Sequence, residues 1–439
     1  MKALVKTSAF ALLLLYFNCS KDVNEPIDPP NNDIPLITSI SPTSGPKETL
    51  VTIFGENFGT NITDVQVRFN GVLAIVQTVS ETEITTLVPN GANTGIVSII
   101  IDGAMADGPI FTYEISQTTV STLAGSIDGY TDATGDNAAF SSPWGITRSS
   151  NGDLYVADRA NHVIRKVTSS GVVTTIAGNG VAGFADGTGT SAQFNSPFGI
   201  AVDRDDNLYV ADYNNHRIRK IATNGTVSTL AGNGTPDLIN DTGTSAAFNG
   251  PLDLAVDDSG NVYVSDEQNN VIRRITPEGI VTTYAGSGIG GDLDGSATEA
   301  QFNEPDGIAV DTNGNVYVAD AFNHKIKKIT PSGDVTTLAG SGTPGAIDGS
   351  GSAAQFNTPT GLYVDANDNI LVAGNFTHKI RQVSPSGIVT TLSGGTAGDM
   401  DGDIALATFN RPSDIVIDAN FTMYVTERGN HKIRVISQD

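Results

Sequence analysis

The chain has 439 residues, of which 39% are hydrophobic and 16% are charged, enough for two or three globular domains with cores of their own. Its 48 glycines indicate many tight turns, as in an all-β protein. Asp and Glu outnumber Lys and Arg by 48 to 24, and a net charge of −24 repels phosphate backbones, so we expect no nucleic-acid partner.

The first 18 residues have the character of a secretory signal peptide. Lys2 and Lys6 precede an apolar stretch, 9–17, that is too short to span a bilayer. The single cysteine, Cys19, follows directly, so no intrachain disulfide can form. Residues 20–35 are polar and rich in Pro and Asn, as in a flexible tether.

This arrangement resembles the signal of bacterial lipoproteins, in which the cysteine is acylated after cleavage. Asn18 and Tyr16 depart from the usual small residue and leucine, but looser signals of this kind are familiar in Bacteroidota. The resemblance implies a signal peptide over 1–18, a lipid on Cys19 and a tether over 19–35. We therefore expect an outer-membrane protein held by its lipid alone, on the cell surface or on the periplasmic face. The alternative is an ordinary secretory peptide with an incidental cysteine.

Residues 36–115 alternate short β-runs with turn residues, which predicts a small β-sandwich. The runs VTIFG (51–55), VQVRF (65–69) and IVSIII (96–101) are rich in branched and aromatic residues. The segments ISPTSGP (40–46), VTIFGENFG (51–59) and FNG (69–71) resemble an IPT/TIG domain, an immunoglobulin-like module. Glu48 stands where that family usually has Gly, which leaves the conformation of one turn open. The resemblance implies a spacer or an interaction domain.

From residue 118 onward the chain repeats itself. A phenylalanine followed three residues later by a proline recurs at intervals of 53 or 54 residues, at Phe140/Pro143, Phe194/Pro197, Phe248/Pro251, Phe302/Pro305, Phe356/Pro359 and Phe409/Pro412. Each unit reads as four short strands separated by Gly- or Asn-containing turns. Four antiparallel strands repeated six times, without helical periodicity, predict a six-bladed β-propeller over 118–439.

The ends of the repeat predict how the ring closes. The last unit stops after its third strand, and a stray fourth strand, VSTLAG (120–125), precedes the first unit. We therefore expect this N-terminal strand to complete the last blade and to remove its open edges. The NHKIR-like and YVAD segments resemble NHL repeats. That resemblance is strong evidence for the fold. It is weak evidence for the function, because family members bind proteins or RNA, act as sensors or are lyases.

Residues that recur in every blade are expected to be framework. All five histidines (His162, His216, His324, His378, His431) occupy one repeat position, where Asn270 stands in the remaining blade. The aspartates that end the second strands (Asp158, Asp212, Asp266, Asp320) are also periodic, and we expect them to bond to backbone amides of the turn that follows. No catalytic motif and no metal site is expected, and no cofactor is implied.

Positions that differ between blades are the candidates for function. Alternating strand direction puts the second-to-third turns and the blade-to-blade connections of about 15 residues on one face, the long-loop face, and tight turns on the other, the tight-turn face. Residues on the long-loop face near the channel mouth combine aromatics with carboxylates, which suit sugar rings, peptide side chains and their polar groups. The candidate ligand-binding residues are Trp144, Phe198, Tyr213, Asp253, Asp306, Phe322, Phe376 and Asp414.

The leading hypothesis is a surface binding protein, not an enzyme, whose long-loop face captures a glycan or a peptide, in the setting of nutrient uptake. A second hypothesis is a metal-dependent lactonase or lyase that uses Asp253, Asp306 and Asp414 at the channel mouth. A third is a structural or adhesive scaffold for a surface protein. The alternative to the ligand-binding hypothesis is that Trp144 and Phe198 only fill the channel and bind nothing.

Overall fold

The structure is a computed structural model that describes residues 34–89, 92–114 and 118–438. The expected signal peptide, Cys19 and all but the last two residues of the expected tether lie outside these residues. The chain divides into two compact units, Met1–Ser116 and Gln117–Asp439. No helix in the described ranges is long and apolar enough to cross a membrane.

The first unit is a β-sandwich. One sheet has the strand order β1-β3-β7-β6 and the other β2-β9-β8-β4-β5. Alternate residues such as Val51, Ile53, Val67 and Ile99 point inward to a single core, as expected for two sheets packed face to face. The bounds are β1 (Leu36–Ser41), β2 (Ser44–Gly45), β3 (Leu50–Glu56), β4 (Val65–Phe69), β5 (Val72–Ala74), β6 (Val76–Val79), β7 (Glu83–Leu87), β8 (Gly95–Ile101) and β9 (Ala104–Tyr113), with the 3-10 turn η1 (Ile62–Asp64) before β4.

The turn that the sequence left open keeps a left-handed conformation. Glu48 adopts a φ of 64°, a region that glycine enters at little cost and other residues do not. Its backbone N–H donates to the carbonyl of Val88 at 2.8 Å, which anchors the turn to the residue after β7 in the same sheet. The glutamate at position 48, where the family usually has glycine, therefore raises the conformational free energy of the turn but does not change its conformation.

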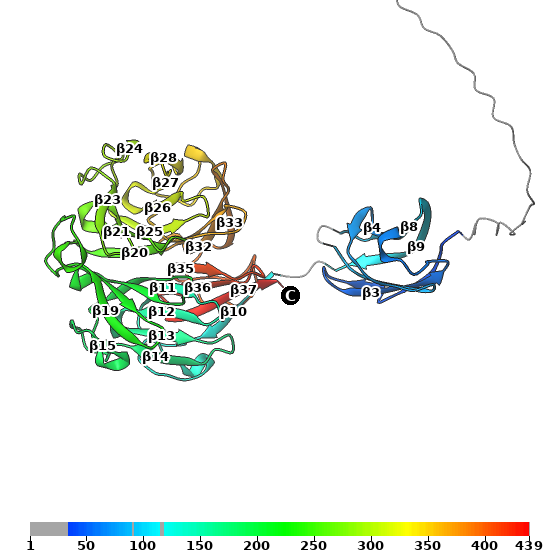
Figure 1. Ribbon diagram of the computed structural model, residues 1–439, viewed down its shortest axis with the longest axis horizontal. Coiled ribbons are helices and arrows are strands. Elements are labelled where there is room, and N and C mark those ends of the chain that lie inside the picture. The colour runs from blue at the N-terminus through cyan, green and yellow to red at the C-terminus, as the bar shows by residue number, and fades with distance from the viewer. Residues whose placement is uncertain (1–33, 90–91, 115–117, 439) are drawn as a thin grey trace, which may run out of the picture. The chain divides into compact units, whose positions relative to one another are not determined.

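The second unit is a ring of six four-stranded blades, which confirms the predicted fold (Figure 1). The first strands surround the axis: β11 (Pro143–Arg148), β16 (Pro197–Val202), β20 (Pro251–Val256), β25 (Pro305–Val310), β30 (Pro359–Val364) and β35 (Pro412–Ile417). The second strands are β12 (Leu154–Asp158), β17 (Leu208–Asp212), β21 (Val262–Asp266), β26 (Val316–Asp320), β31 (Ile370–Gly374) and β36 (Met423–Glu427).

The third strands are β13 (Val163–Val167), β18 (Arg217–Ile221), β22 (Val271–Ile275), β27 (Lys325–Ile329), β32 (Lys379–Val383) and β37 (Lys432–Gln438). The fourth strands are β14 (Val173–Ala177), β19 (Thr226–Ala231), β23 (Val281–Ala285), β28 (Asp334–Ala339), β33 (Ile388–Gly394) and, for the last blade, β10 (Thr118–Ala124). Between the second and third strands lie 3-10 turns, η3 (Arg159–Asn161), η5 (Tyr213–Asn215), η7 (Glu267–Asn269) and η8 (Ala321–Asn323).

Strand β10 closes the ring as predicted. It pairs antiparallel with β37, from Thr118 opposite Gln438 to Ala124 opposite Ile433, and in Figure 1 the cyan β10 lies beside the red β37. Val120 enters the apolar core of this last blade together with Phe409 and Ile436. Because the fourth strand comes from the start of the unit, β37 is not left as an open edge.

The long connections run differently from the expectation. They descend the outer edge of the blade that follows and pair there as a fifth strand of two residues: β15 (Gly187–Thr188), β24 (Gly295–Ser296), β29 (Gly349–Ser350) and β34 (Gly402–Asp403). The N–H of Gly189, for example, reaches the carbonyl of Gly225 in a turn of the tight-turn face. The connections therefore cover blade edges, and the channel mouth is left to the second-to-third turns.

Candidate functional site

The recurring side chains form a framework, as predicted. Each third strand carries a buried cation, and in five of the blades it pairs with the acid that ends the second strand. Arg219 Nη1, for example, lies 2.8 Å from Asp212 Oδ2, and both side chains are fully buried. The same guanidinium stacks over Phe194, the phenylalanine of the Phe-Pro repeat, at 5.1 Å. In the fifth blade Gly374 replaces the acid, and Arg381 keeps only the outer partner, Asp348, whose equivalent in the second blade is Asp186.

The acids make a different bond from the one expected. Oδ1 of Asp212 accepts the N–H of Asn195, which lies before the first strand of the blade and not in the following turn. Oδ2 of Asp212 accepts from Arg219 and from the side chain of Asn215. Burial nevertheless raises the pKa of the equivalent Asp158 and Asp266 to about 6.

The histidines connect neighbouring blades, which confirms their framework role. Nδ1 of His162 accepts the backbone N–H of Ser196 in the next blade at 3.0 Å, and His431 likewise joins the last blade to Ser142 of the first. In the blade that lacks a histidine, Oδ1 of Asn270 accepts the N–H of Glu304. The residue that donates has a positive φ, for example 53° at Ser196, so this bond stabilises a strained connection.

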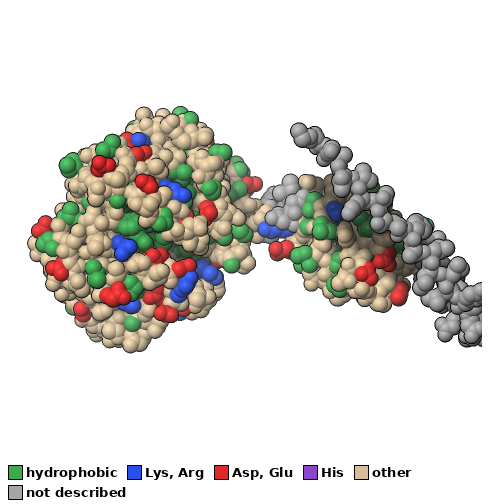
Figure 2. All heavy atoms as spheres, turned by 45° about the horizontal axis from the view of Figure 1, so that its top comes forward, with side chains coloured by type: hydrophobic (Ala, Val, Ile, Leu, Met, Phe, Trp, Pro, Cys, Tyr) green, Lys and Arg blue, Asp and Glu red, His purple; other side chains and the backbone are tan. Residues whose placement is uncertain are grey.

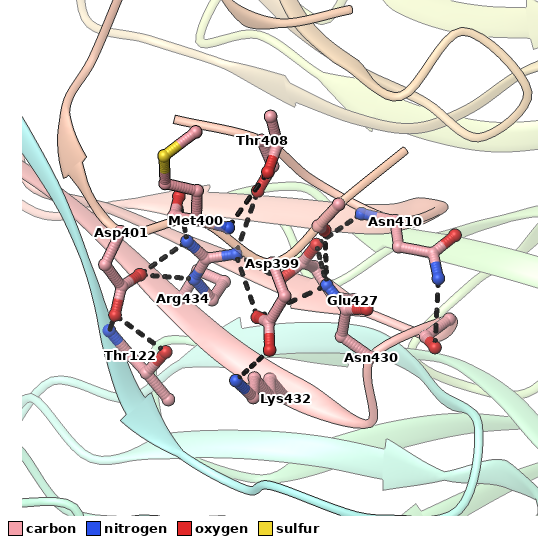
Figure 3. A network of polar contacts seen from close by, with 12 residues as sticks. Thr122, Asp399, Met400, Asp401, Thr408, Asn410, Glu427, Asn430, Lys432 and Arg434 are labelled. Carbon is pink, nitrogen blue, oxygen red and sulfur yellow. Dashed lines mark hydrogen bonds and ion pairs between the residues drawn. The ribbon is translucent and has the colours of Figure 1, made fainter. Parts of the chain in front are cut away.

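Asp399 and Asp401 belong to the same framework. Figure 3 shows Arg434 between Glu427 and Asp401, with Asp399 directed at Lys432 and Asp401 at Thr122 of β10. These carboxylates are neutralised by cations of the closing blade. Their spacing therefore reflects ion pairing within the last blade.

At the long-loop face, six side chains close the channel, one at the second position of each first strand. Trp144, Phe198 and Leu252 form a buried apolar cluster, in which the Trp144 and Phe198 rings lie 4.8 Å apart. Across the ring, Thr360 and Ser413 satisfy their hydroxyls on backbone carbonyls. The sixth member is Asp306, whose Oδ1 is buried and has no hydrogen-bond partner among the described residues.

Asp253 and Asp414 face the other end of the channel. Each carboxylate accepts the N–H of the next blade's first strand, Asp253 from Ile308 at 3.0 Å and Asp414 from Ile146 at 2.8 Å. They line a cavity of about 330 Å³ that extends to the ends of the first strands at the tight-turn face. The described part of the chain contains no group of three or more His, Cys, Asp or Glu placed to hold a metal ion.

Above the closing ring lies a second cavity, the mouth pocket, of about 360 Å³. Its floor is formed by Trp144, Phe198, Leu252 and Asp306, and its walls by the first residues of four second-to-third turns, Arg159, Tyr213, Glu267 and Arg428. On the propeller face in view in Figure 2, hydrophobic side chains alternate with basic and acidic ones. A cavity of this size and mixed character is typical of a small-ligand site.

The wall residues are held by the floor and by one another. The Arg159 guanidinium lies 4.5 Å from the centre of the Phe198 ring, and that of Arg428 lies 5.0 Å from Trp144. The hydroxyl of Tyr213 donates to Glu267 at 2.6 Å. Burial, then the charges of Glu267, Asp253 and Asp414, hold the pKa of Asp306 well above its usual range.

The structure brings together four of the eight candidate residues: Trp144, Phe198, Tyr213 and Asp306. Asp253 and Asp414 belong to the channel below. Phe322 and Phe376, which are 54% and 50% exposed, lie on the turns of the fourth and fifth blades and do not line the pocket. The ligand-binding role of all eight stays a prediction.

Sequence reasoning missed Arg159, Glu267 and Arg428. The signal was present, because the residue that follows the end of the second strand reads Arg159, Tyr213, Glu267, Ala321, Asn375 and Arg428 through the six blades. This position departs from the repeat in the same way as the position after the proline. What distinguishes this turn position from an ordinary variable turn is its location above the channel, and that location is known only from the structure.

Family models match both units. An IPT/TIG domain matches residues 35–113, NHL repeats match 140–166, 194–221 and 248–274, and a Teneurin NHL domain matches 286–348. NHL repeat-containing protein 2 of Homo sapiens is 31% identical over 298 residues, which cover 59% of this chain and 41% of that protein. Protein SUPPRESSOR OF QUENCHING 1, chloroplastic, of Arabidopsis thaliana is 30% identical over 275 residues, 58% of this chain and 26% of that protein.

Solved structures cover nearly the whole chain. A protein of unknown function from Bacteroides thetaiotaomicron superposes with a TM-score of 0.67 at 23% identity, over 93% of this chain and 99% of that one. An auxiliary nutrient binding protein from Bacteroides ovatus superposes with a TM-score of 0.60 at 20% identity, with the same coverage. This chain spans about a quarter to two fifths of the length of the two curated relatives above, so it shares repeats with them and not their whole architecture. The chain is thus an all-β protein that joins an IPT/TIG domain to a six-bladed propeller of NHL repeats.

Proposed function

We propose that the propeller is a binding module that holds a glycan or a peptide in the mouth pocket, without catalysing a reaction on it. The observation that carries this proposal is Asp306, which is 8% exposed and lies in the pocket floor with Oδ1 unpartnered. A buried acceptor without a partner costs about 1–3 kcal/mol. A ligand donor at this position would supply the missing bond, whereas the carboxylates of the framework already accept from their arginines, as Asp212 does from Arg219.

The similarity to the auxiliary nutrient binding protein supports the same reading. That description belongs to a protein of the same fold at 20% identity. It therefore supports ligand binding by a propeller of this kind but does not identify a ligand. The pocket adds the local chemistry, since guanidinium, carboxylate and phenol groups converge on one cavity of about 360 Å³.

A blocking variant tests the proposal. Asn214 is exposed at the pocket rim, so Asn214→Trp should fill the cavity, while Thr223→Trp places the same side chain on the tight-turn face. Panels of oligosaccharides and short peptides are screened by calorimetry against the unmodified protein. A ligand that Thr223→Trp retains and Asn214→Trp loses by at least about tenfold supports the pocket. A ligand that both variants retain assigns binding to another surface, and a panel without any ligand contradicts the proposal for these two classes.

We also propose that the protein works at the cell surface, anchored through lipid on Cys19, with the IPT/TIG unit as a spacer. The support is the sequence alone: the apolar stretch 9–17 followed by Cys19 and a polar tether. Cells grown with labelled palmitate should label the protein but not Cys19→Ser, and protease added to intact cells should digest it. Equal labelling of both proteins would remove the anchor, and protection from protease would place the protein on the periplasmic side.

A further inference from the structure

The charges of the mouth pocket are segregated by blade. Arg428 and Arg159 belong to the sixth and first blades, which are neighbours through the closure of the ring, whereas Glu267 and Asp306 belong to the third and fourth. In a closed ring of six, the sixth blade lies opposite the third and the first opposite the fourth. The two cations therefore occupy one side of the axis and the two acids the other, with Tyr213 between them on the second blade.

The basic side is not neutralised. Within the described residues, neither Arg159 nor Arg428 forms an ion pair, although both are half-buried against Trp144 and Phe198. The cations of the framework, by contrast, each have a carboxylate partner, as Arg165 has in Asp158. Burial, then the charges of Arg411 and Arg159, lower the pKa of Arg428, and the charge of Asp306 opposes this shift without forming an ion pair with it. In a chain with a net charge of −24, this is a place for an anionic group of a ligand.

On the acidic side, some acceptor oxygens have no donor among the described residues. Oδ1 of Asp306 is buried without a partner, and Glu267 accepts from Tyr213 and Gln268 through one oxygen, Oε2. An ammonium group has three donors and a positive charge, so it could satisfy both acids at once. A sugar hydroxyl would satisfy one acceptor but would bring no positive charge to Glu267.

We propose that the ligand is a short zwitterionic peptide, with its carboxylate at Arg159 and Arg428 and its free amino group at Glu267 and Asp306. This inference rests on the proposed function and selects the peptide from its two ligand classes. A zwitterion also carries no net charge, so the acidic chain does not repel it as it would repel an acidic oligosaccharide. The cavity of about 360 Å³ leaves room for a peptide of two or three small residues and no long chain.

Calorimetry with end-blocked peptides tests the inference. The probes are trialanine, its N-acetylated form, its C-terminal amide and trigalacturonate. Trialanine should bind, and each blocking group should weaken binding by at least about tenfold, because a buried charge is left unpaired. Arg428→Gln should bind trialanine and its amide equally, and Glu267→Gln should bind trialanine and its acetylated form equally.

Matched controls remove the same charges elsewhere. Arg204→Gln and Glu278→Gln alter exposed residues of tight-turn-face segments and should preserve the discrimination between free and blocked ends. Equal binding of free and blocked trialanine by the unmodified protein would overturn the inference, as would an absence of binding to any peptide. Binding of trigalacturonate that Asn214→Trp abolishes would overturn the peptide inference while leaving the proposed function standing. If no glycan and no peptide of either panel binds the unmodified protein, both the peptide inference and the proposed function are contradicted.

Discussion

Two rings of charged side chains surround the axis of the propeller, and they obey opposite rules. In the framework ring each buried cation has an acid, a phenylalanine and backbone carbonyls around it, as Arg219 has Asp212, Phe194 and the carbonyl of Gln193. In the mouth ring Asp306 has an unpartnered oxygen, and Arg159 and Arg428 have no ion pair within the described residues. The repeated charges of the framework ring therefore stabilise the fold. The charges of the mouth ring differ between blades and are left free to contact a ligand.

The largest expected effect comes from breaking the framework ring. Arg219→Ala leaves the carboxylate of Asp212 buried without its cation, which should lower the free energy of unfolding by about 3–5 kcal/mol. Urea denaturation measures it. Arg428→Ala serves as the control from the mouth ring, since its guanidinium has no carboxylate partner to strand, and equal losses in the two variants would contradict the distinction between the rings.

A gain in stability is expected at the mouth. Asp306→Asn removes a buried charge that lies near Glu267, Asp253 and Asp414, and the free energy of unfolding should rise by about 1 kcal/mol. The folded-state pKa of Asp306 is raised above the unfolded value of about 3.9, so its stabilising contribution is present at low pH and is lost as the pH rises through the folded-state pKa. The gain in Asp306→Asn should accordingly be larger at pH 8 than at pH 5. A loss of stability at both values would assign Asp306 to the framework.

The histidine bonds should make stability depend on pH. Burial lowers the pKa of His324 below its usual 6.5, and Nδ1 must be unprotonated to accept the N–H of Thr358. The contribution of such a group is fully present above pH 6.5 and is lost as the pH falls through the lower folded-state pKa.

The chain supplies its own control in Asn270, which makes the equivalent bond without titrating. His324→Asn should therefore retain stability at pH 7.5 and lose less than the unmodified protein between pH 7.5 and pH 5.5, as measured by thermal unfolding at both values. An unchanged pH dependence would show that the imidazole does not titrate in this range.

The smallest effect is expected at the exposed aromatics. Phe322 is 54% exposed, so Phe322→Ala should change the free energy of unfolding by no more than about 0.5 kcal/mol. Because Phe322 does not line the mouth pocket, ligand affinity should stay within roughly twofold in calorimetry. Trp144→Ala opens a cavity in the channel plug and should cost about 3–5 kcal/mol, so it is an unsuitable probe of binding. A large loss of affinity in Phe322→Ala would extend the ligand beyond the pocket.

The sequence by itself determined the fold. A repeat of 53 or 54 residues fixes the number of blades, and the displaced strand 120–125 fixes the closure, because a four-stranded unit that lacks a strand must take one from elsewhere in the chain. The framework role of the histidines also follows from sequence, since side chains repeated at the third strands lie away from the axis and do not converge on one point.

The tertiary structure alone decided which exceptions to the repeat work together. Asp253 and Asp306 stand at adjacent positions of the repeat in neighbouring blades, yet one carboxylate caps a backbone amide inside the channel and the other lies unpartnered at the mouth. Arg428 and Arg159 are far apart in sequence and became neighbours through the closed ring. The repeat in the sequence identifies the positions that differ between blades. The position of each side chain along the axis, and the blade that lies opposite it, depend on the assembled ring.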